Sequence, residues 1–160
     1  SSPSRGLGDV YKRQDLRSVT LSMAILELTE KTLSYEDPHP DLFEVLKDVL
    51  NSINERESDP NLIFWFYECI LLSYLGFKPN LDENNLPGIN LPDLNKAPNS
   101  RLILSSLLSE KIDQLPDDTI TKNDRKVISK YLWVLLCYHF EGLQNVKSFQ
   151  VARNILSTSN

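Results

Sequence analysis

Basic side chains are concentrated toward the end of the sequence. They are Lys122, Arg125, Lys126, Lys130, Lys147 and Arg153. Successive lysines at 122, 126 and 130 are four residues apart, so a helix would carry them on one face. Clustered lysine and arginine side chains bind phosphate or carboxylate groups. Two interpretations follow: a solvated helix face, or a patch that binds an anionic partner such as a DNA backbone or an acidic peptide.

Residues that could catalyse a reaction or hold a metal are few and scattered. They are His39, His139, Cys69, Cys137 and the pair Asp117–Asp118. Cys137 and His139 are two apart on an expected helix and so point away from each other. The sequence contains no phosphate-binding glycine loop, zinc-protease motif or serine-hydrolase motif. We expect no cofactor, no metal and no enzymatic activity. A small helical enzyme with dispersed catalytic residues is an alternative.

The elements that must position these residues are helices. Apolar residues repeat with a period near 3.6, which predicts helices at about 16–33, 41–53, 62–75, 100–113, 125–139 and 148–156. In the first, the spacing 16-19-23-26 forms an apolar stripe. Thr121 is a candidate N-cap, and Asp124 three residues later resembles a capping box. Gly76 and Gly142 are placed to end two of the helices.

The segment 62–75 (LIFWFYECILLSYL) is apolar nearly all round, which predicts the central, buried helix. Glu68 within it needs a cationic neighbour or a place at the rim, because an unpaired buried charge is costly. The segment of about 77–99 is rich in proline and asparagine and reads as a long irregular loop or hairpin. The expected fold class is all-α, a compact orthogonal bundle of about six helices.

The bulk composition fits one globular domain of 160 residues. The formal net charge of −5 argues against a strong binder of nucleic acid over its whole surface, but not against a local basic patch. No apolar run is long enough for a membrane span and no signal peptide is recognisable, so we expect an intracellular protein. Residues 1–14 (SSPSRGLGDVYKRQ) resemble translated sequencing-library junctions, and we interpret them as non-native.

Three segments resemble the helical domain of the bacterial DNA repair protein RecO. They are MAILELTEKTLSYEDPHPDLFEVLKDVLNSI (23–53), LIFWFYECILLSYLGFKPNLD (62–82) and YLWVLLCYHFEGLQNVKSFQVARNIL (131–156). The three segments have the order and spacing of the family, and the likeness spans about residues 16–156. It implies a RecO-like C-terminal helical domain at 15–160, with the N-terminal OB-fold of the family missing.

The resemblance also implies a function. RecO proteins are recombination mediators of the RecFOR type, which anneal strands and help to load RecA without being enzymes. The implied partners are the C-terminal tail of single-strand-binding protein, RecR, and single-stranded DNA, the last mainly through the missing OB-fold. The implied location is the bacterial cytoplasm, at the nucleoid. Many relatives carry a four-cysteine zinc site after the central helix, but residues 78–99 contain no cysteine. A generic helical adaptor is an alternative.

Docking of an acidic, apolar tail needs an apolar cleft and a cation. Where many relatives have an arginine in the central helix, this chain has Trp65. The cation is therefore sought among Arg125, Lys126, Lys130, Lys147 and Arg153. Trp65 or Tyr74 would line the cleft; the alternative is that both rings belong to the core.

Overall fold

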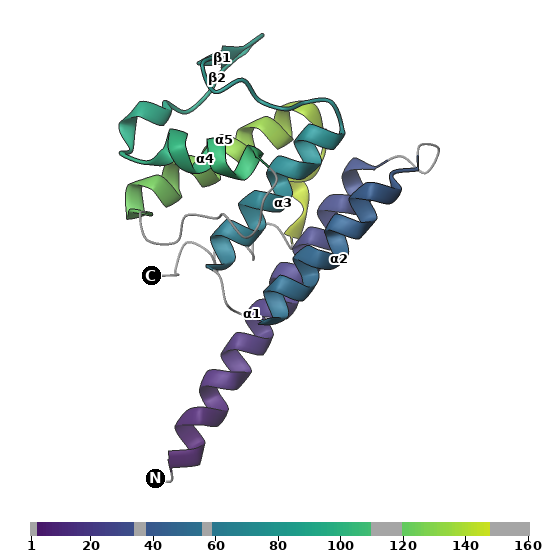
Figure 1. Ribbon diagram of the computed structural model, residues 1–160, viewed down its shortest axis with the longest axis vertical. Helices are drawn as coiled ribbons and strands as arrows, with labels where there is room; N and C mark the ends of the chain where they lie inside the picture. The colour runs from purple at the N-terminus through teal and green to yellow at the C-terminus, as the bar shows by residue number, and fades with distance from the viewer. Residues whose placement is uncertain (1–2, 34–37, 56–58, 110–119, 148–160) are drawn as a thin grey trace.

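The computed structural model describes residues 3–33, 38–55, 59–109 and 120–147. The α-helices among them are α1 (Pro3–Thr32), α2 (Pro40–Glu55), α3 (Pro60–Tyr74), α4 (Ser100–Leu108) and α5 (Lys122–His139). Two strands, β1 (Asn85–Leu86) and β2 (Ile89–Asn90), and two 3-10 helices, η1 (Leu94–Lys96) and η3 (Leu143–Asn145), complete the elements. The all-α fold class is confirmed (Figure 1). The helix predicted at 148–156 lies outside the described residues.

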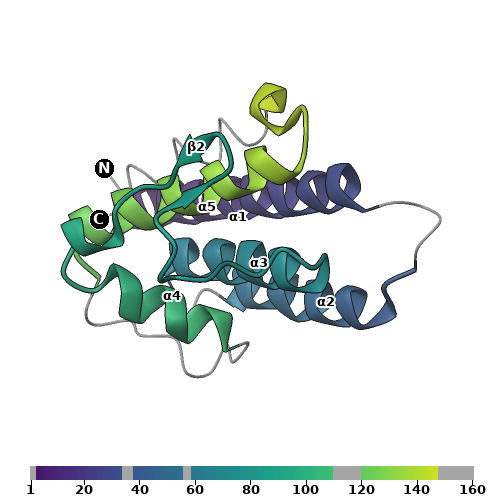
Figure 2. The same ribbon diagram turned by 90° about the horizontal axis from the view of Figure 1, so that it is seen from above.

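Helix α3 is the centre of the bundle, as its sequence predicts. Every residue from Asn61 to Leu72 is buried, and α3 contacts α1, α2, α4 and α5. Figure 2 shows α3 in the middle, with α2 and α4 on one side and α5 on the other. A helix that is apolar on all faces needs neighbours on all sides, and the fold supplies them. No helix in the described ranges is long and apolar enough to cross a membrane.

Both ends of α3 are set by local sequence. Asp59 caps the start, because its Oδ1 atom accepts a hydrogen bond of 2.9 Å from the Asn61 N–H group. Pro60 occupies the first turn, where its missing N–H group costs nothing. Gly76 ends the helix with a φ of 86°, and the N–H group of Phe77 then donates to the Leu72 carbonyl at 2.7 Å.

Helix α1 packs on α2 and α3 through a different face from the apolar stripe noted in the sequence. The core face of α1 consists of Leu21, Ala24, Ile25 and Leu28. The stripe of Leu16, Val19, Met23 and Leu26 is instead exposed, at 67%, 54%, 53% and 47%. Both sets have helical spacing, so the packing partners decide which one is buried.

The first helix also begins earlier than predicted. The sequence pattern placed its start near Leu16, whereas α1 begins at Pro3 and its N-terminal part extends away from the bundle (Figure 1). A proline in the first turn of a helix costs no hydrogen bond, and no further proline follows before Pro38. The interpretation of residues 1–14 as non-native stays a prediction.

The proline-rich segment after α3 is an ordered hairpin followed by a 3-10 turn. Strands β1 and β2 are antiparallel, with Leu86 opposite Ile89, and Gly88 in the turn has a φ of 88°. That backbone conformation is one that glycine adopts without strain. Leu91 and Leu94 are buried, and η1 contacts α4 and α5. The segment therefore covers part of the core, as the hairpin alternative predicted.

Candidate partner and nucleic-acid interface

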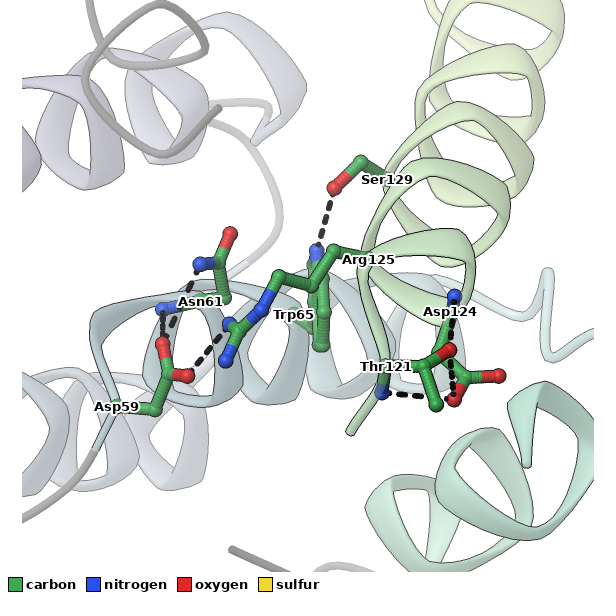
Figure 3. Close-up of polar contacts among 7 residues, drawn as sticks. All are labelled: Asp59, Asn61, Trp65, Thr121, Asp124, Arg125 and Ser129. Atoms are coloured by element: carbon green, nitrogen blue, oxygen red, sulfur yellow. Dashed lines mark hydrogen bonds and ion pairs between the residues drawn. The ribbon is translucent and has the colours of Figure 1, made fainter. Parts of the chain in front are cut away.

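The start of α5 is fixed by a capping box, as its sequence predicts. The Thr121 hydroxyl accepts a hydrogen bond of 3.1 Å from the Asp124 N–H group, and Asp124 Oδ2 accepts one of 2.9 Å from the Thr121 N–H group. The Thr121 hydroxyl also donates to Asp124 Oδ2 at 2.8 Å. These contacts, drawn in Figure 3, define where the basic helix begins.

The same carboxylate fixes α4 against α5. Asp124 Oδ1 accepts hydrogen bonds from the Asn99 N–H group at 2.9 Å and from the Ser100 hydroxyl at 3.1 Å. Asp124 is fully buried. Burial raises the pKa of its carboxyl group, but the hydrogen bonds from Thr121, Asn99 and Ser100 outweigh burial and leave the pKa below its usual value. The group is therefore an ionised structural link between two helix starts.

The outer face of α5 carries Lys122, Lys126 and Lys130, and all three side chains are exposed. We call these three residues the lysine face. At a rise of about 1.5 Å per residue, the face is about 12 Å long. None of the three has an ion-pair partner within the described part of the chain. The only acidic residue of α5 is Asp124, which is buried, so the face is locally positive on an acidic protein.

Arg125 lies at the edge of the lysine face and turns toward α3. Its Nη1 atom is 2.5 Å from Asp59 Oδ2, and Figure 3 shows the two side chains meeting between the helices. Next to this pair, the Trp65 ring donates from Nε1 to the Ser129 hydroxyl at 3.0 Å. These two contacts hold α5 on α3 and leave the lysine face directed outward.

Trp65 is 1% exposed, so its ring does not line an open cleft. The core alternative is the one that the structure supports, because α3 is covered by the other helices. Tyr74 is partly buried and packs against the core. Glu68 is also buried, so the alternative that placed it at a rim is wrong.

Of the other two predicted cations, the structure describes only Lys147. Lys147 is exposed but follows η3, beyond the opposite end of α5 from the lysine face. Arg153 lies outside the described residues. The structure therefore brings together Lys122, Lys126 and Lys130, with Arg125 at their edge.

Sequence reasoning missed Trp133. This residue follows Lys130 by three positions and Lys126 by seven, which places it on the same face of α5. Its side chain is half-buried and packs partly against the core. Aromatic rings beside lysines are typical of surfaces that bind single-stranded nucleic acid. The helical spacing from the lysines was the signal that could have identified it.

Within the described residues, no group of three or more His, Cys, Asp or Glu side chains could hold a metal ion. Burial, and secondarily the charge of Glu68, raises the pKa of the Cys69 thiol well above its usual value, which disfavours the reactive thiolate. Cys137 is half-buried.

The family model and the individual relatives that match this chain all point to the same protein family. The family model for the C-terminal part of Recombination protein O matches residues 13–148. The chain is 33% identical over 89 residues to the DNA repair protein RecO of Exiguobacterium sibiricum, covering 49% of this chain and 35% of that protein. It is 21% identical over 155 residues to the RecO of Flavobacterium psychrophilum, and this match covers 89% of this chain and 63% of that protein.

A third relative, the RecO of Bacillus pumilus, is 35% identical over 71 residues, which is 44% of this chain and 27% of that protein. The matches thus cover between 27% and 63% of the length of these relatives. No solved structure matches significantly. Since the family model spans most of the chain, from residue 13 to residue 148, the chain belongs to the Recombination protein O C-terminal family.

Proposed function

We propose that this chain acts in recombinational DNA repair as a mediator that binds other macromolecules and catalyses no reaction. Its partners in this proposal are single-stranded DNA, the acidic tail of single-strand-binding protein, and RecR. It works in the bacterial cytoplasm, at the nucleoid. The relatives are named as DNA repair proteins, which supports the pathway.

The observation that carries the proposal is the lysine face of α5. Three exposed lysines on successive turns present a row of ammonium groups, and the acidic residue nearest to them in sequence, Asp124, is buried and hydrogen-bonded. A phosphate backbone can follow such a row because each lysine contacts one phosphate as a point charge.

Binding of a fluorescently labelled oligothymidine tests the proposal. The variant Lys122→Gln/Lys126→Gln/Lys130→Gln should bind about tenfold to a hundredfold more weakly than the parent chain, because about 0.7 counterion is released per phosphate contact with single strands. Fluorescence anisotropy at fixed salt gives the Kd of each protein.

The matched control is Lys31→Gln/Lys47→Gln/Lys78→Gln, which removes the same charge from exposed lysines of α1, α2 and the segment after α3. Its Kd should stay within about twofold of the parent value, since charges away from the contact act only through screened, long-range fields. Equal weakening by both triple variants would show that net charge, and not the lysine face, governs binding. Equal affinity of all three proteins would also contradict the proposal.

A further inference from the structure

An ion pair joins the edge of the lysine face to the start of α3. Arg125 Nη1 lies 2.5 Å from Asp59 Oδ2, and the two side chains are 22% and 20% exposed. Both side chains are therefore held by the fold and partly exposed, while the Arg125 Nη1 atom at the contact is itself buried. Arg125 adjoins Lys126 in sequence and follows Lys122 by three residues, so it lies beside the lysine face. Its guanidinium group reaches Asp59 at the start of α3 (Figure 3).

The two oxygens of Asp59 have separate tasks. Oδ1 caps α3 by accepting from the Asn61 N–H group at 2.9 Å and from the Asn61 side-chain amide at 3.3 Å. Oδ2 holds Arg125 through one guanidinium nitrogen. A guanidinium group has five N–H donors and binds carboxylate or phosphate best through two parallel bonds. The contact with Asp59 thus engages Arg125 without using the full capacity of its donors.

We propose that Asp59 stands in for a phosphate group of single-stranded DNA at Arg125, so that the closed ion pair masks a fourth cation of the binding face. The inference rests on the proposed function. When DNA binds, a phosphate replaces the carboxylate at Arg125, and Asp59 keeps its cap on α3 through Oδ1. Because the pair must open first, the parent chain binds DNA more weakly than it would with Arg125 free.

The substitution Asp59→Asn separates the two tasks of the side chain. Asparagine caps a helix as well as aspartate does, so the start of α3 is kept while the ion pair is lost. The affinity for labelled oligothymidine should rise about threefold to tenfold, as expected for one added phosphate contact on a single strand. Adding Arg125→Gln to this variant should abolish the gain.

Glu44→Gln is the matched control. It removes the same charge and also breaks an ion pair, since Glu44 Oε1 lies 3.2 Å from Lys47 Nζ on the exposed side of α2. Its affinity should stay within about twofold of the parent value, because an exposed charge away from the contact is screened. An equal gain in Asp59→Asn and Glu44→Gln would overturn the inference by assigning the gain to net charge.

Two further outcomes separate this inference from the proposed function. If the lysine-face variant binds weakly while Asp59→Asn binds like the parent chain, the masking of Arg125 is refuted and the proposed function stands. If the lysine-face variant and its control bind alike, the proposed function itself is refuted. Far-UV circular dichroism and urea unfolding of each variant confirm that its helix content and stability match those of the parent chain in every comparison.

Discussion

Replacement of Asp124 by asparagine should destabilise the fold more than any surface change. The Asp124 carboxylate accepts four hydrogen bonds, two on each oxygen, from Asn99, Ser100 and Thr121. An asparagine oxygen can accept the two on one side, but its amide NH₂ group would then face two donors on the other. Each bond to a charged group is worth about 1.5–3 kcal/mol, and a buried donor without a partner costs about 1–3 kcal/mol.

These contributions overlap, so we expect Asp124→Asn to lower the free energy of unfolding by about 2–4 kcal/mol. That is a large share of the roughly 5–15 kcal/mol that stabilises a domain. Urea unfolding followed by far-UV circular dichroism measures it. The controls Thr121→Ala and Ser100→Ala each remove only part of the network, and each should cost about 1 kcal/mol.

The effect of Asp124→Asn should also depend on pH with a defined sign. Hydrogen bonds hold the pKa of Asp124 below 3.8, its unfolded reference, despite its burial. The ionised carboxylate therefore contributes its full stability above that reference value, and the contribution is lost as pH falls through the folded pKa. A loss below about 0.5 kcal/mol at neutral pH, which is usual for surface substitutions, would refute the reasoning.

The two faces of α1 give a second prediction: Leu28→Ala, at a position that is 0% exposed, should cost about 2–5 kcal/mol in urea unfolding. Leu26→Ala, at a position that is 47% exposed, should cost less than about 1 kcal/mol, and equal losses would contradict the assignment of the core face. Burial lowers the pKa of His139, whose ring stacks on Phe77 at 4.0 Å between centroids. As pH falls, His139 therefore becomes protonated in the unfolded chain before it does in the folded protein. The free energy of unfolding should fall as pH drops from about 6.5 to the folded pKa. His139→Gln should remove that part of the pH dependence. If the free energy of unfolding of this variant depends on pH as that of the parent chain does, the assignment to His139 is contradicted.

Most of the helices and the capping box of α5 follow from local sequence. The periodic apolar residues, Gly76 after the third helix, and Thr121 with Asp124 are signals within a few residues of one another. The lysine face is also local, because its spacing of four residues fixes a shared side once the helix forms. These features could be predicted without tertiary information.

The remaining features depend on contacts between distant residues. Leu16 and Leu28 both belong to helical apolar patterns, and only the position of α2 and α3 determines that Leu28 is the buried one. Asp59 and Arg125 are 66 residues apart in the chain, so no pattern in the sequence indicated their ion pair. The same holds for the bond from Trp65 to Ser129, which places an aromatic ring in the core and not at a binding cleft.

Salt dependence of single-stranded DNA binding tests the central claim most directly. The logarithm of the association constant of the parent chain should fall linearly with the logarithm of salt concentration, with a slope of about −0.7 for each phosphate contacted. Replacing Lys122, Lys126 and Lys130 with glutamine should make that slope shallower by about 2, while the control at Lys31, Lys47 and Lys78 should leave it unchanged. Parallel lines for the two triple variants would contradict the assignment of phosphate binding to α5.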